Sequence, residues 1–492
     1  MISVHDAGRE SAVGDLATFR RELHRCLSAR ADALFELADA VLCADGPVRS
    51  LPALSLVAEH RRGHGALYDA LGAGRIDVQR LRTVVASTPI PRAADGRIVL
   101  AVDVTCWLRP EAHTVPERIL CHTYGRGKDQ HIGVPGWPYS FVVALEAGRS
   151  SWTAPLDAIR LVPGTDLAAA TAGQVRDVLG RLIAAGHWRP GDLEIWVVMD
   201  AGYDGARLAW LLRDLPVRIL ARMRSDRVLR RAPRPWTPGP KCGRPPRHGS
   251  EFIFGDPTSW ETPDVTTVTE TRLYGTATAR AWYRLHPRLT RRAAWADCPE
   301  LPILEGTVMR LDVQRLPSGA TAKPVWLWWS AGADPAGDPD AAMVNRLWQA
   351  FLRRFDIEHT FRLLKQTLGW TVPKLRDPHA ADRWTWLIIA AHTQLRLARP
   401  LAADLRHPWE RPAPPDRLTP ARVRRGFRHL RPTTACPASA PKPTRPGPGR
   451  PPGRPNRHPT RRHDVHIVIS SDTTSQKTRK KKSTNPRPRR TG

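Results

Sequence analysis

Two continuous apolar runs constrain the fold of this chain more than any other feature. Residues 98–108 read IVLAVDVTCWL and residues 195–199 read IWVVM, and neither run alternates apolar with polar side chains. A strand without a polar face needs cover on both sides of its sheet, as the central strands of α/β proteins have. The chain is therefore predicted to build a sheet with helices on both faces.

The segments around these two runs alternate between strand and helix patterns. Further strands are expected around 118–124, 139–146 and 217–223, and helices over 168–185 and 205–215. The resulting β-β-β-α-β-α-β order predicts an α/β fold on a mixed sheet.

Composition and periodicity divide the chain into five expected segments. They are an all-helical region, 1–92; the first part of the α/β core, 93–224; a basic linker with a β-rich insertion, 225–338; the second part of the core, 339–400; and a basic Pro/Arg-rich tail expected to be largely disordered, 401–492.

The net charge of +29 points to a polyanionic partner. Of the 76 basic residues 66 are arginine, the side chain that binds phosphate bidentately. The tail over 441–492 holds 15 basic and 2 acidic residues, or +13, so the remaining +16 belongs to the body of the chain. Hydrophobic residues make up 41%, which is enough for a core and excludes a wholly disordered basic protein.

Cysteine spacing and hydropathy argue against two other classes of protein. The seven cysteines include no C-x-x-C pair, which disfavours a disulfide framework or a zinc knuckle. No stretch approaches 18 uncharged apolar residues, so neither export nor a membrane-spanning helix is expected.

Two aspartates lie in or next to the apolar runs, where burying a carboxylate costs free energy. Asp103 lies inside the first run, and Asp200 directly follows the second. A buried carboxylate needs a cationic partner or a metal ion, and ligands of open α/β sheets bind at the carboxyl ends of the strands. For Asp200 alone, a structural role in the turn DAGYDG is an equally good interpretation.

A third carboxylate, Glu358, follows on a predicted helix. At about 100° per residue in one continuous helix, it shares an inward stripe with Phe351, Arg354 and Lys365, whereas Asp356 points away. For a lone Glu358, an ordinary intrahelical salt bridge is the commoner explanation. Three converging carboxylates instead favour a Mg²⁺ or Mn²⁺ site for phosphodiester chemistry.

The spacing around Glu358 resembles a known signature. Phe351-x(2)-Arg354-x(3)-Glu358-x(6)-Lys365 is similar to the Tyr-Arg-Glu-Lys signature of the DDE transposases of bacterial insertion sequences, with phenylalanine in place of tyrosine. Together with the order of the two aspartates, the resemblance covers about residues 95–395.

This resemblance implies a ribonuclease H-like core with Asp103, Asp200 and Glu358 as the catalytic, metal-binding triad. Arg354 and Lys365 would contact DNA phosphates, and the ring of Phe351 would lie beside the DNA. The implied reaction is Mg²⁺-dependent cleavage at the inverted repeats that end the element, with Mn²⁺ as a substitute, followed by strand transfer into target DNA. A homodimer in a synaptic complex, a DNA-end-binding role for 1–92 and a bacterial, cytoplasmic and nucleoid-associated location are implied as well.

Two Gly-Arg-Pro runs add expected DNA contacts. One carries Arg244 and Arg247, the other Arg450 and Arg454. Such runs resemble AT-hook peptides, which lay arginines along a narrow minor groove. A flexible, solubilising basic linker explains the composition equally well.

Two other functions compete with a transposase. One is a catalytically inactive, transposase-derived DNA-binding protein, and the other is a host nuclease with the same metal chemistry. The complete carboxylate triad disfavours the first, and the arginine and lysine of the signature disfavour the second.

Overall fold

The computed structural model describes residues 4–124, 131–148, 150–235, 244–292, 295–296, 298–331, 337–442, 453 and 460–466. Its main sheet has ten strands. They are β3 (Val99–Leu108), β4 (Ile119–Tyr124), β5 (His131–Leu145), β6 (Thr153–Arg160), β7 (Ile195–Met199), β8 (Val217–Met223), β11 (Val265–Thr271), β12 (Gly275–Leu285), β13 (Gly306–Val313) and β14 (Val325–Ser330). Two short ribbons pair β1 (Leu27–Ala29) with β2 (Arg75–Ile76) and β9 (Val228–Arg230) with β10 (Glu251–Ile253).

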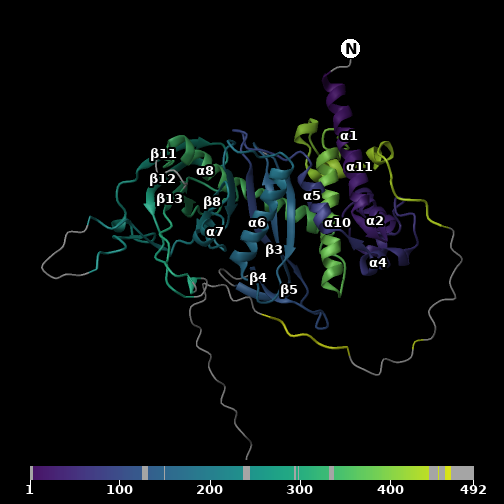
Figure 1. Ribbon diagram of the computed structural model, residues 1–492. Coiled ribbons are helices and arrows are strands. Elements are labelled where there is room, and N and C mark those ends of the chain that lie inside the picture. Colours follow the sequence, from purple (N-terminus) through teal and green to yellow (C-terminus); the bar gives the residue numbers. More distant parts are fainter. Residues whose placement is uncertain are drawn as a thin grey trace, which may run out of the picture.

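Helices surround this sheet (Figure 1). They are α1 (Val4–Arg25), α2 (Ala31–Cys43), α3 (Leu51–Leu54), α4 (His64–Ala73), α5 (Val78–Ala86), α6 (Leu167–Ala184), α7 (Gly205–Leu211), α8 (Ala341–Arg353), α9 (Asp356–Arg362), a π-helical turn (Leu363–Thr367), α10 (Pro378–Ala398) and α11 (Pro420–Leu430). Short 3₁₀ turns cover Pro257–Ser259, Pro415–Arg417 and Arg431–Thr433. The prediction of a mixed α/β fold is confirmed.

The sheet order is β11-β12-β13-β14-β8-β7-β3-β5-β4, and β6 also pairs with β5. The central strands β3, β7 and β8 are parallel, and the other pairs are antiparallel. All five residues of β7 are buried, which accounts for the continuous apolar run that predicted it.

Helices cover both faces of the sheet, as two successive residues of β5 show. Ser140 hydrogen-bonds the side chain of Gln174 in α6, and the ring of Phe141 lies 5.3 Å from that of Phe361 in α9. Because neighbouring side chains of a strand point to opposite faces, α6 and α9 lie on opposite sides.

The strands of the expected β-rich insertion continue the main sheet. β14 pairs antiparallel with β8, with Trp328 opposite Ala221, and β13, β12 and β11 follow outward. The expected boundary at residue 225 therefore separates two segments of a single sheet. Edge-to-edge pairing between distant segments leaves no local mark in the sequence, which is why periodicity did not reveal it.

The helical N-terminal region packs directly on the rest of the molecule. In Figure 1, α1 and α2 gather with α10 and α11 at one end of the sheet. Arg20 of α1, which is fully buried, donates to Asp39 of α2 at 2.6 and 2.9 Å and to Gln394 of α10 at 2.6 Å. This buried contact joins the first helices to a segment more than 350 residues later.

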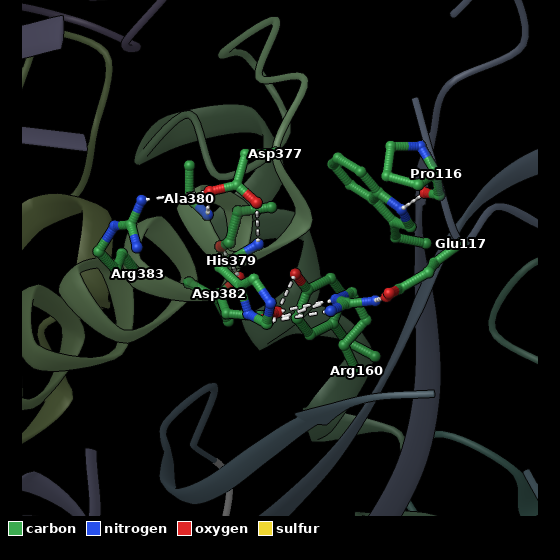
Figure 2. Close-up of polar contacts among 12 residues, drawn as sticks. Pro116, Glu117, Arg160, Asp377, His379, Ala380, Asp382 and Arg383 are labelled. Carbon is green, nitrogen blue, oxygen red and sulfur yellow. Dashed lines mark hydrogen bonds and ion pairs between the residues drawn. The ribbon is translucent and has the colours of Figure 1, made fainter. Parts of the chain in front are cut away.

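A second polar network fastens α10 to the sheet (Figure 2). Arg160, at the end of β6, donates to Asp382 of α10 and to Glu117. Tyr139 donates its hydroxyl proton to the same Asp382 at 2.7 Å, and Asp377 caps the helix by accepting from two backbone N–H groups. The start of α10 is thereby fixed against β5 and β6.

The expectation of a largely disordered tail over 401–492 is wrong for its first part. α11 lies against α2 and α10, and its residues Val423 and Phe427 are fully buried. The guanidinium of Arg424 donates to the backbone carbonyls of Val41 and Gly46. The prediction failed because the arginines of α11 bind backbone carbonyls at and just after the end of α2, and composition alone made them resemble a solvated basic segment.

A later piece of the tail, residues 460–466, also contacts the sheet. His466 forms a parallel bridge with Ile119 of β4, with backbone hydrogen bonds of 2.9 and 3.0 Å to Leu120 and Arg118. An edge strand presents unpaired backbone groups, and this segment satisfies some of them.

No helix in the described part of the chain is long and apolar enough to cross a membrane.

The packing of α11 yields a stability prediction. Phe427→Ala should lower the free energy of unfolding by about 3–5 kcal/mol, because it empties a fully buried site. Urea denaturation measures the change. Trp409→Ala removes a larger side chain that is 80% exposed, so it should change stability by less than about 0.5 kcal/mol. Equal losses in the two variants would show that α11 does not contribute to the core.

Candidate active site

Asp103 is held in the middle of the central strand β3. The four residues before it, 99–102, are buried, and its own side chain is 16% exposed. The N–H of Val104 donates to its Oδ1 at 2.8 Å. Rigid packing on both sides of β3 therefore fixes the position of this carboxylate.

Asp200 is the first residue after β7. In the parallel pairing of β3 and β7, Val102 stands opposite Met199, so Asp103 and Asp200 follow at neighbouring positions. Asp200 accepts the N–H of Ala201 at 2.8 Å, and its side chain is 34% exposed. The structure thus brings together two aspartates that lie 97 residues apart in the sequence.

Arg354 connects the two carboxylates. Its Nη1 lies 2.8 Å from Asp103 Oδ2, and its Nη2 lies 3.5 Å from Asp200 Oδ2. The Arg354 side chain is 9% exposed. Arg222 of β8 reaches the other oxygen of Asp200 at 3.4 Å. Two guanidinium groups therefore balance the two aspartates.

Burial makes ionisation of Asp103 costly despite these guanidinium groups. The pKa of Asp103 is raised to about 7, chiefly by burial and also by the charges of Glu358 and Asp200, against the opposing effect of Arg354. Because both acids act on Asp103, all three carboxylates contribute to one electrostatic site.

Glu358 lies on a separate helix, α9, and not on the single continuous helix that the sequence predicted. α8 ends at Arg353, α9 begins at Asp356, and the π-helical turn follows at Leu363–Thr367. The helix is therefore interrupted between the signature residues. Glu358 is exposed in the first turn of α9, rather than on a buried stripe.

The expectation that Asp356 points away from the core is wrong. Asp356 is 8% exposed and pairs with Arg353, whose Nη2 lies 2.6 Å from Asp356 Oδ2. Burial raises the pKa of Asp356 to about 7. The break between α8 and α9 rotates α9 relative to the angular register that a single helix would keep.

The carboxylate oxygens of the site are suitable ligands for a divalent metal ion, although the side chains are not close enough together to surround one. Within the described ranges, no three His, Cys, Asp or Glu side chains gather closely enough to hold an ion. Asp103 and Asp200 already flank a cation, the guanidinium of Arg354. Carboxylate oxygens are the donors that Mg²⁺ and Mn²⁺ prefer, so the two aspartates fit such an ion.

The sequence matches a protein-family model. The model of the family described as DDE superfamily endonuclease matches residues 22–288, more than half of the 492 residues. The chain belongs to the DDE superfamily endonucleases. The match includes Asp103 and Asp200 and ends before Arg354 and Glu358. No curated protein matches the chain.

Lys365 of this DDE endonuclease lies in the π-helical turn and is half-buried. Burial lowers the pKa of Lys365, and the charge of Glu358 opposes that change, as do the neighbouring thiols of Cys106 and Cys121. The ammonium nitrogen lies 5.8 Å from the ring centroid of Trp370. Lys365 is therefore near Glu358, on the side of the site formed by β3 and β4.

The other residues expected to contact DNA differ in their exposure and in their partners. Phe351 is 7% exposed and packs in the core, with the Arg354 guanidinium 5.9 Å from its ring. Arg247 donates to the carbonyl of Leu301, and Arg244 is exposed. Arg450 and Arg454 lie outside the described residues.

Three tryptophans of β14 that could have stacked on DNA bases are core residues. Trp326, Trp328 and Trp329 are each 2–3% exposed. Trp326 stacks on Phe254 with ring centroids 4.3 Å apart. Their burial indicates core packing rather than stacking on DNA.

Two residues near the site were missed by sequence reasoning. One is Arg222, the second partner of Asp200. The other is Tyr203, which is half-buried and whose pKa is raised by burial of its hydroxyl and by the charge of Asp103. Arg222 could have been found, because β7 and β8 are parallel with Met199 opposite Ala221, and the next residues are Asp200 and Arg222. Tyr203 carried no comparable signal.

The raised pKa of Asp103 predicts a pH dependence of stability. Between about pH 4 and pH 7 the folded protein holds a proton on Asp103 that the unfolded chain has lost, so stability falls as pH rises. Asp103→Asn cannot ionise and keeps an oxygen for Arg354. Without metal it should be more stable than wild type by about 1–3 kcal/mol at pH 8 and about equal at pH 4.

Denaturant unfolding in EDTA at both pH values measures this difference. Asp177→Asn, at an exposed position of α6, is the control and should show no pH-dependent change. A destabilised Asp103→Asn at pH 8 would mean that its ion pair with Arg354 outweighs the cost of burial.

Proposed function

We propose that this DDE endonuclease is a transposase of a bacterial insertion sequence, with a ribonuclease H-like core. It would cleave DNA at the inverted repeats that end the element and join those ends to target DNA. The observation that carries the proposal is the ion pairing of Arg354 with Asp103 and Asp200 on neighbouring parallel central strands, in a chain of this family. The charge of Glu358 acts on the same Asp103.

Asp103, Asp200 and Glu358 would hold the metal, Mg²⁺ or Mn²⁺. Such ions activate the attacking oxygen and stabilise the leaving oxygen of an in-line phosphodiester displacement. The exposed position of Glu358 leaves that side of the site accessible to DNA.

The proposed role of Arg354 differs from that of the carboxylates. It balances the charge of Asp103 and Asp200 in the structure, and a guanidinium can exchange carboxylate oxygens for phosphate oxygens. We infer that Arg354 transfers from the aspartates to a DNA phosphate when the site is loaded. Lys365, held beside Glu358, supplies a second positive charge for the DNA end.

The wider assignments follow from this proposal. The helical region 1–92 would bind the DNA ends, two copies of the chain would pair the ends in a synaptic complex, and the protein would act at the bacterial nucleoid. Arg244, Arg247, Arg450 and Arg454 would add contacts to the DNA backbone or minor groove.

Charge removal at the triad tests the proposal. Asp103→Asn, Asp200→Asn and Glu358→Gln should each reduce Mg²⁺-dependent cleavage by more than about 100-fold, because each removes a metal-binding charge while preserving shape. The substrate is a labelled duplex carrying the inverted repeats that flank the gene. DNA binding in EDTA should change by less than about threefold.

Asp177→Asn is again the matched control, since Asp356 is buried and cannot serve as a silent position. Wild-type protein without any cleavage would favour the inactive DNA-binding protein. Cleavage that ignores the inverted repeats would favour the host nuclease.

Arg354→Gln gives an independent test of the charge balance. The loss of the guanidinium leaves the carboxylates to repel one another, so the melting temperature in EDTA should fall. Adding Mg²⁺ should raise the melting temperature of Arg354→Gln more than that of wild type. An equal rise in both would show that Arg354 and the metal do not share the aspartates.

A further inference from the structure

A cleft begins directly beside Asp200. Its volume is about 700 Å³, and most of its walls come from three parts of the chain. These are the residues that follow Asp200, 201–206; the segment through β8 and β9, 221–230; and the loop after β12, 287–292. The cleft is thus continuous with the candidate active site.

Arginine dominates the lining of this cleft. Six arginines line it: Arg222, Arg224, Arg227, Arg230, Arg288 and Arg292. Two acids, Asp204 and Glu251, accompany them, so the lining carries four more positive than negative charges. Asp204 caps α7, and Glu251 is paired with Arg230. The acids are therefore already engaged within the protein.

Two of these arginines differ from most others in the molecule. Arg288 and Arg292 are exposed, and among the described residues their side chains form no hydrogen bond or ion pair. Elsewhere, arginines such as Arg20 and Arg424 are buried against carboxylates or backbone carbonyls. Like charges gathered in a concave site repel one another and concentrate the local positive potential, which a polyanion relieves.

The size of the cleft limits what it can hold. A volume of about 700 Å³ is that of a small-ligand site, commonly about 300–1,000 Å³. It accommodates a short length of one nucleic acid strand and is too small for a duplex. A positive groove that follows the backbone is the usual means of binding single strands.

We propose that this cleft binds the sugar–phosphate backbone of a single DNA strand that continues from the phosphate at Asp200. Arg222 would join the two sites, because it lines the cleft and reaches Asp200 at 3.4 Å. The inference rests on the proposed function only in taking the ligand to be DNA. Binding in the cleft requires neither metal nor cleavage.

The test compares a double variant with a matched control. Arg288→Gln/Arg292→Gln removes two charges from the cleft. Arg189→Gln/Arg272→Gln removes two exposed charges that lie outside it. Fluorescence anisotropy in EDTA, over a range of KCl concentrations, measures binding of a labelled oligo(dT) and of a duplex of equal length.

The cleft variant should bind oligo(dT) about 10- to 100-fold more weakly. The slope of log affinity against log salt should fall by about 1.4, since each lost contact to a single strand contributes about 0.7. Its duplex affinity should change by less than about threefold, and the control should stay within about threefold for both ligands.

Equal losses in the two double variants would overturn the proposal, because they would show a general charge effect. An equal loss for duplex and oligo(dT) in the cleft variant would also overturn it, in favour of a duplex-binding surface. Unchanged circular dichroism of all variants verifies the fold. If wild type cleaves no DNA, the proposed function fails, while these binding measurements still decide the role of the cleft.

Discussion

The contact of Arg354 with Asp103 and Asp200 is the interaction on which the arrangement of the site depends. It joins the break between α8 and α9 to two central strands, across 251 and 154 residues of sequence. Two carboxylates held close together in a partly buried position repel each other, and their ionisation is costly without a cation. The guanidinium offsets part of that cost by lowering the pKa of Asp103, which burial nevertheless raises to about 7.

Much of the large positive charge of the chain has a structural role. Asp157, which is almost fully buried in β6, lies between Arg82 of α5 and Arg181 of α6, at 3.0 and 2.7 Å. Arg20 joins α1, α2 and α10 in the same manner. A surplus of arginine is thus divided between groups that hold helices to the sheet and groups that stay exposed around the cleft. Net charge alone cannot distinguish the two.

The fold was predicted best where a local pattern is strong. The apolar runs of β3 and β7 and the helical spacing of α6 indicated their elements, because period and burial are properties of neighbouring residues. The register of one continuous helix failed at Asp356, since a break of two residues between α8 and α9 shifts every later side chain. The role of α11 was missed because its arginines bind carbonyls of a helix almost 400 residues earlier.

The sequence by itself determined a mixed α/β sheet, one aspartate inside and one directly after a buried strand, and a large positive net charge. These follow from apolar periodicity, from the cost of an acid in an apolar strand and from composition. Only the tertiary structure decided that Arg354 stands between the aspartates, that Glu358 rather than Asp356 is exposed and that Arg288 and Arg292 border a cleft. Burial and charge pairing depend on segments that are distant in the chain, and their contacts exist only once the sheet and helices have packed.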